Sequence, residues 1–363
     1  MSRPSSSETP DSRVRTPKRP RTDSSSMSPL PAPFVRNTQF WYDDGNVIIV
    51  AQNVGFRVYK GLLSKSSRVL GYMVNAAQLP PSQSRDQPES GDNCTVVHVT
   101  DTAAEMRSLL MVLLEGRHYM QRRLEFTFED MANCIQLAYK YEIEDLLEDS
   151  LKELRRYYSD DFDAWDSRVE SAEPTHAIVA VNLARLVCPG AQSLFPSAIY
   201  ACCQLDAMEM VDGHKREDGA VDSLSREDLA LCINGKAELC VRAVPFIHKL
   251  FGLTNNTSCT SSDQCRKSLT SLQNLRSSRV NVSDGCDLLA SWEGKIRKCG
   301  SGRRTSAERD MPLCASCITA LCIRERMLRR EIWLDKVWLD VSALQALDED
   351  ESEEDDAESA QDH

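Results

Sequence analysis

The sequence predicts an α+β protein in which a small sheet capped by a helical cluster precedes a mainly α-helical C-terminal region. Three segments of strand length, at residues 46–51, 56–59 and 95–100, lie in the first third of the chain. From residue 102 onwards, apolar side chains recur mostly at helical spacing. Strands that precede a run of helices are typical of α+β folds rather than of alternating α/β folds.

The first ordered segments are predicted to form a β-hairpin. Residues 46–51 are a short continuous apolar run suited to a buried strand, and residues 56–59 alternate after a turn that contains Asn and Gly. Apolar residues at helix-compatible spacing follow over residues 62–73. A Pro/Ser/Gly-rich polar loop at 78–93 then leads to the third strand at 95–100.

Residues typical of helix starts and helix ends mark the next predicted helix. Thr102 and Glu105 form a capping box, apolar residues follow at i, i+3, i+4, i+7 and i+8, and Gly116 ends the pattern. Two further helices are predicted over residues 128–138 and 143–158 from their apolar spacing.

The second half, residues 174–345, has a mostly helical pattern without an internal repeat. A break at Asn234–Gly235 divides one of the apolar patterns, and the cysteines near residue 260 lie in a Ser/Thr/Asn-rich loop. The predicted helices cover residues 175–187, 195–210, 225–233, 236–251 and 311–345.

Both ends of the chain are predicted to be disordered tails. Residues 1–33 are rich in Ser and Pro and contain the basic cluster PKRPR at 17–21, a candidate nuclear import signal. Residues 348–363 are almost entirely acidic.

Composition limits the function classes. The net charge of −12 over 363 residues excludes nucleic acid as the main ligand. No run of about 20 apolar residues exists, so no membrane span is expected. The polar N-terminus predicts an intracellular protein of the nucleus or cytoplasm, where the 14 cysteines stay reduced.

Four cysteines form the strongest chemical motif. Cys314 and Cys317 are spaced so that two thiolates can chelate one tetrahedral metal ion, and Cys259 and Cys265 lie upstream in a separate loop. Together they predict a structural zinc site that ties the last helix to the body.

The sequence also allows other assignments of these cysteines. Cys299 and Cys322 are alternative ligands, and all of these residues can instead be free thiols in small apolar contacts. A redox role for Cys314 and Cys317 requires a thiol of low pKa at a helix start. No P-loop, His-Glu-x-x-His or Gly-x-Ser-x-Gly motif is present, and we expect no enzyme activity.

Four stretches stand out in the first ordered block, residues 34–160: residues 44–50 (DGNVIIV), 56–67 (FRVYKGLLSKSS), 96–116 and 138–143 (AYKYEI). In these stretches the block resembles a BTB/POZ domain. Together with Arg-Arg-Tyr-Tyr at 155–158 and a cysteine-bearing helical C-terminal half, the layout is similar to a large group of fungal BTB proteins.

The resemblance implies a protein–protein interaction adaptor. Its BTB domain would pair with a second copy or recruit a cullin-type ubiquitin ligase, and the helical half would select the substrate. Among the tyrosines of residues 139–158, we expect Tyr139 and Tyr157 to be exposed partner-binding anchors, because the helical period places others in the core. The alternative function is a nuclear transcriptional cofactor with a structural zinc site.

Overall fold

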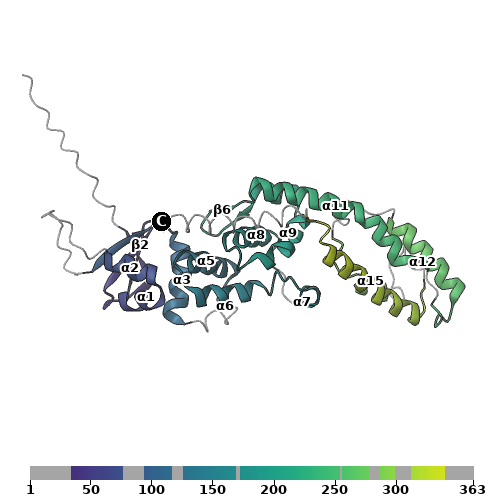
Figure 1. Cartoon of the computed structure of the whole chain (residues 1–363), viewed down its shortest axis with the longest axis horizontal. Coiled ribbons are helices and arrows are strands. Elements are labelled where there is room, and N and C mark those ends of the chain that lie inside the picture. The colour runs from purple at the N-terminus through teal and green to yellow at the C-terminus, as the bar shows by residue number, and fades with distance from the viewer. Residues whose placement is uncertain are drawn as a thin grey trace, which may run out of the picture.

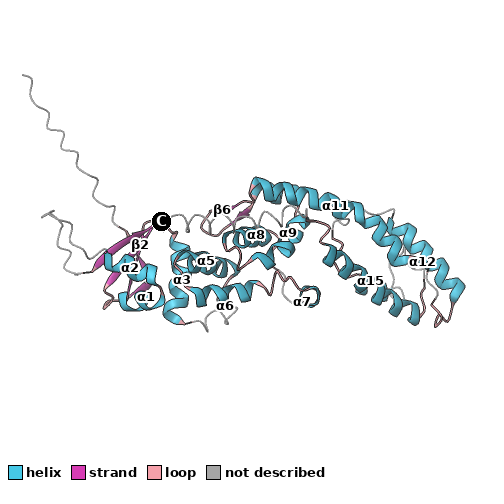
Figure 2. Ribbon diagram, in the orientation of Figure 1, coloured by secondary structure: helices cyan, strands magenta, loops and turns pink. Residues whose placement is uncertain are grey.

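A computed structural model describes residues 34–76, 94–116, 126–168, 172–253, 256–277, 287–298 and 312–339. Over these residues the fold is α+β, as predicted, with a small sheet near the N-terminus and a helical C-terminal part (Figure 2). The tails predicted to be disordered, and the polar loop predicted at 78–93, lie outside the described residues.

The sheet has four strands in the order β1-β3-β2-β4. β2 and β3 form the predicted hairpin, and β4 lies parallel to β2 on its other side. All five residues of β2 are buried, which explains its continuous apolar sequence. The strands are β1 (Val35–Trp41), β2 (Val47–Ala51), β3 (Val54–Val58) and β4 (Thr95–Val99).

Strand β1 was not predicted from the sequence. It pairs parallel to β3 at the edge of the sheet, and Phe40 is its one buried residue. Since an edge strand needs few apolar side chains, the polar residues of β1 gave no periodic signal.

The helical stretch predicted at 62–73 is divided at Ser67 into α1 (Lys60–Ser66) and α2 (Arg68–Ala76). The Ser67 hydroxyl accepts a hydrogen bond from the Leu70 amide and donates one to the Tyr141 carbonyl. It therefore starts α2 and fixes it to the following helical layer.

The capping box predicted at Thr102 and Glu105 starts α3 (Ala103–Glu115). Gly116 ends the helix with a φ of 91°, a conformation that favours glycine. Both the start and the end of α3 were therefore predicted correctly from the sequence.

Helix α5 (Phe128–Lys140) belongs to two hydrophobic cores. Cys134 and Leu137 pack into the core of the sheet, α1, α2 and α3, whereas Met131 and Ile135 pack into the core of the C-terminal helices. The N-terminal unit and the helical body therefore share a buried surface.

The helical body contains α6 (Glu144–Leu154), α7 (Phe162–Ser167), α8 (His176–Leu186), α9 (Phe195–Gln204) and α10 (Ala207–Asp212). The single helix predicted at 195–210 is interrupted because Asp206 starts a new helix with its own capping box. A short hairpin follows, β5 (His214–Lys215) with β6 (Val221–Asp222). Neither this hairpin nor α7 was predicted.

Helix α11 (Arg226–Phe251) is continuous, although the sequence predicted a break at Asn234–Gly235. A Cβ atom at Gly235 would lie 2.5 Å from the carbonyl oxygen of Trp338. This glycine therefore permits close packing of the final segment on the helix and does not end it.

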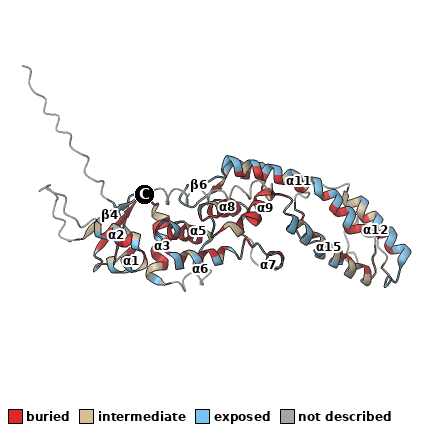
Figure 3. Cartoon of the chain, in the orientation of Figure 1, coloured by how far each residue is buried: buried red, intermediate tan, exposed pale blue. Residues whose placement is uncertain are grey.

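The distal half of α11 packs with α12 and α15, and α14 packs on α15; together they form an arm that extends from the body (Figure 1). α15 begins at the far end of the arm and returns to the body, where Trp333 and Trp338 pack beside Tyr200 and Trp165. The outward side of α11 is largely exposed in Figure 3.

The other arm helices are α12 (Ser262–Ser277), α14 (Glu293–Lys298) and α15 (Ala315–Asp335). Within the described residues, every helix is too short or too polar to span a bilayer.

Candidate metal centre

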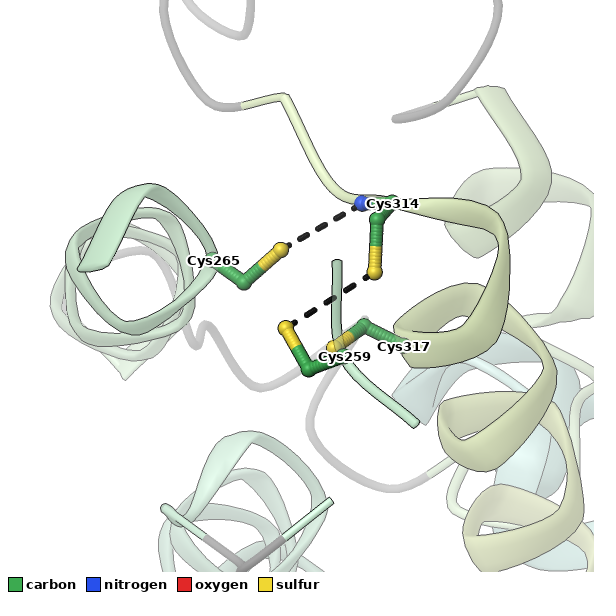
Figure 4. A group of neighbouring side chains, drawn as sticks. All are labelled: Cys259, Cys265, Cys314 and Cys317. Atoms are coloured by element: carbon green, nitrogen blue, oxygen red, sulfur yellow. Dashed lines mark hydrogen bonds between the residues drawn. The ribbon is translucent and has the colours of Figure 1, made fainter. Parts of the chain in front are cut away.

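The far end of the arm brings four cysteines together (Figure 4). Cys259 lies in the loop before α12, and Cys265 lies in the first turn of that helix. Cys314 is the N-cap residue of α15, and Cys317 lies in its first turn. A sequence separation of three on a helix start places both thiols on the same side, which is why this spacing predicts chelation.

The spacing of the thiols fits a tetrahedral metal ion. All four Sγ atoms lie within 4.8 Å of one another, and those of Cys259 and Cys314 are 3.8 Å apart. Two sulfur ligands at about 2.3 Å from a tetrahedral zinc are separated by about 3.8 Å. The four cysteines predicted from the sequence are therefore the set that the fold assembles, and they can hold a metal.

The alternative ligands are not part of this group. Cys322 lies on α15 but outside the cluster, and Cys299 falls outside the described residues. Among the residues that the structure describes, no other group of three or more His, Cys, Asp or Glu side chains has this arrangement.

Polar N–H groups surround the thiols. The backbone amide of Cys314 donates to the Sγ of Cys265 over 3.3 Å, and the Nδ2 of Asn256 donates to the Sγ of Cys317 over 3.5 Å. Such donors stabilise negative charge on thiolate ligands. Asn256 was missed by the sequence analysis, because nothing in its own sequence context distinguishes it from other loop asparagines.

The thiols differ in acidity. Burial opposes ionisation of Cys314, but hydrogen bonds from the backbone and side chains of Cys317 and Thr260 outweigh it and lower its pKa to about 6. Burial and the neighbouring thiols of Cys259 and Cys314 raise the pKa of Cys317 to about 12. The Cys314 thiolate is thus available at neutral pH, and binding of a cation would release the proton of Cys317.

A cavity of about 510 Å³ adjoins the cluster and is lined by Cys259, Cys265, Cys317, Arg266 and Leu253. Cys265 and Cys317 are buried, whereas Cys259 and Cys314 are half-buried. Solvent and metal ions can therefore reach the cluster without unfolding of the arm.

The tyrosines predicted as partner anchors lie in different environments. Tyr139 has 45% of its surface exposed. Tyr157 is half-buried and contacts the Phe128 ring edge-on, with centroids 5.8 Å apart. Tyr141 and Tyr158 are buried in the core, in accord with the helical period of this region.

Comparisons with known proteins found no match: no family model, no curated protein and no solved structure is similar to the chain at a significant level.

Proposed function

We propose that the chain is a protein-binding adaptor with two binding surfaces, one on the N-terminal unit and one on a helical arm that a zinc ion holds together. The observation that carries the proposal is the four-cysteine cluster at the far end of an arm whose helices present apolar side chains to solvent. An extended arm fixed at both ends is suited to presenting a surface to a partner.

Zinc is the metal that the donor set favours. Four thiolates at tetrahedral spacing form a closed, sulfur-only site, which is typical of structural zinc. The cluster joins the start of α12 to the start of α15, and these segments are 49 residues apart in the sequence between Cys265 and Cys314. A metal at this position would stabilise the far end of the arm.

The arm carries two rows of exposed apolar residues. On α15, Ile323, Met327 and Leu334 are each more than half exposed, and their spacing places them on one helix face. On the distal half of α11, Val241 is more than half exposed, and Val244, three residues further on, is 39% exposed. Exposed apolar rows on otherwise charged helices are typical of protein-binding surfaces.

The N-terminal surface is assigned from the resemblance to BTB/POZ domains. That resemblance implies a cullin-type ubiquitin ligase or a second copy of the chain as the partner. Tyr139 supports this assignment, since an exposed tyrosine offers a rigid, amphipathic contact of the kind that dominates interfaces.

Two variants distinguish binding by the N-terminal surface from binding by the arm. The full-length chain is expressed in its native cell, and captured proteins are quantified by mass spectrometry. Tyr139→Ala should lose a cullin and retain the arm's partner, whereas the double variant Ile323→Ser, Met327→Ser should do the reverse. Each variant is thus the control for the other.

Identical capture by both variants and by the unmodified chain would contradict the two-surface adaptor. Recovery of chromatin proteins in place of a cullin would instead favour the transcriptional cofactor.

A further inference from the structure

A second polar site lies far from the cysteine cluster, where the β5–β6 hairpin meets α5 and α8. It surrounds a cavity of about 460 Å³ lined by His176, His214, Glu129, Glu173 and Lys215. These residues come from separate segments of the chain.

Ion pairs hold the hairpin in place over this cavity. Arg216 of the hairpin pairs with Asp222 at 2.6 Å and with Glu105 of α3 at 3.3 Å. The charge of Arg216 is therefore neutralised by carboxylates on both sides, and the position of the neighbouring His214 is fixed.

His214 has a buried nitrogen without a hydrogen-bond partner. The residue is 5% exposed, its Nδ1 lies 2.9 Å from the hydroxyl of Thr175, and its Nε2 makes no hydrogen bond. When Nδ1–H donates to Thr175, the lone pair of Nε2 points into the site. The nearest carboxylate oxygen, Oε1 of Glu129, is 3.5 Å from that Nε2.

A lone pair and a carboxylate oxygen at this distance repel each other unless a proton or a metal ion lies between them, and 3.5 Å is long for an N–H···O hydrogen bond. Nitrogen and oxygen ligands at about 2.0–2.1 Å from a tetrahedral zinc are separated by about 3.4 Å. A histidine whose other ring nitrogen donates to an oxygen is the usual arrangement of a metal-binding imidazole. Thr175 therefore has the role of an orienting group.

A second histidine–carboxylate pair lies beside the first. Nε2 of His176 is 3.8 Å from Oε2 of Glu173, and the rings of His176 and His214 have centroids 4.9 Å apart. Phe128 stacks on the His176 ring at 4.0 Å and fixes its orientation. The Glu173 side chain is 75% exposed and rotates at little cost.

We propose that this cavity is a binding site for a divalent transition-metal ion of the zinc class, with His214 Nε2 and Glu129 as its fixed ligands. Only the four cysteines place three or more ligand atoms together within the described residues. Glu173 and His176, which line the same cavity, would complete the coordination when the ion binds. The ion would connect α5, the hairpin and the start of α8.

The test is metal stoichiometry on the full-length chain. Protein is equilibrated with Zn²⁺, desalted, and analysed for zinc per chain by mass spectrometry. The unmodified chain should retain two ions, and His214→Gln and Glu129→Gln should each retain one. His98→Gln, at an exposed histidine of β4, should retain two. Since Glu129→Gln preserves shape, circular dichroism should show it folded even if His214→Gln is not.

The outcomes distinguish this site from the cysteine centre. A single ion that is lost in Cys317→Ser but kept in His214→Gln and Glu129→Gln would overturn this inference and leave the proposed arm centre intact. A single ion that is kept in Cys317→Ser but lost in His214→Gln and Glu129→Gln would support this site and contradict the proposed arm centre. Equal loss in His98→Gln would also overturn the assignment, because that residue lies outside the cavity.

Discussion

The Sγ atoms of Cys259 and Cys314 lie 3.8 Å apart, although 55 residues separate them in the sequence. Their contact joins the loop that follows α11 to the N-terminus of α15 at the far end of the arm. At the opposite end of α15, Trp333 packs against Trp165 of the body, and Trp338 donates a hydrogen bond to the carbonyl of Pro196. The helix α15 is therefore held at both of its ends.

Removal of metal should destabilise the arm. A ligand present at about a thousand times its dissociation constant stabilises the folded state by about 4 kcal/mol, and a chelator abolishes this contribution. Cys317→Ser should have the same effect, because one of four ligands is lost. Hydrogen exchange should show increased opening of α12 and the start of α15.

The matched control is Cys322→Ser on the same helix, at a half-buried cysteine outside the cluster. It should leave metal content and exchange rates unchanged. Equal loss of metal in both variants would show that the cluster is not the ligand set.

Arg329 attaches α15 to the body through buried charges. It is 3% exposed, contacts Asp166, and donates through Nη2 to Glu325 over 3.2 Å. Arg329→Ala should lower the free energy of unfolding by about 3–5 kcal/mol, because it leaves Glu325 buried without its cation. Chemical denaturation measures this change.

Arg326 is the control, since it pairs with Asp163 while 56% exposed. Arg326→Ala should cost at most about 1 kcal/mol, as is usual for a surface ion pair. Similar losses for both variants would mean that burial of the Arg329 pair has no special effect.

Tyr141 should make the protein sensitive to alkaline pH. Burial, the hydrogen bond that its hydroxyl donates to Asp101 and the charge of Asp101 raise its pKa well above 10. The unfolded chain then releases this proton at lower pH than the folded chain, so stability is complete below about pH 10 and falls as pH rises further.

Tyr141→Phe should therefore reduce stability at neutral pH by about 1–3 kcal/mol and flatten its decline above pH 10. Denaturation curves at several pH values measure both effects. Tyr139→Phe, at the exposed neighbour, should change neither; an unchanged alkaline slope in Tyr141→Phe would contradict the assignment.

Tyr139 and Tyr157 should respond differently to truncation. Tyr139→Ala should weaken partner capture by about 2 kcal/mol or more and leave thermal stability nearly unchanged. Tyr157→Ala should lower the melting temperature, because it removes the packing against Phe128. If Tyr139→Ala also unfolds the protein, this tyrosine is a structural residue and not an anchor.

Sequence patterns identified those parts of the fold that depend on local signals. The hairpin of β2 and β3, the capping box of Thr102 and the cysteine set all follow from residue type and spacing. Two cysteines three residues apart are a recognisable metal-binding spacing, whereas Asn256, His214 and Glu129 stand in no such motif, and their partners are distant in the sequence.

The missed elements depend on tertiary contacts. Strand β1 is polar because it lies at an edge, and α11 continues through Gly235 because Trp338 packs against it. The β5–β6 hairpin has two residues in each strand and is held by Arg216, whose carboxylate partners include Glu105, 111 residues away. No local pattern reports such contacts.

The four-cysteine metal centre is the claim on which the arm depends, and X-ray absorption at the zinc edge tests it most directly. The sample is the full-length Glu129→Gln variant loaded with one equivalent of zinc. The account predicts four sulfur ligands at about 2.3 Å. A shell dominated by nitrogen or oxygen, or a protein that retains no zinc, would contradict it.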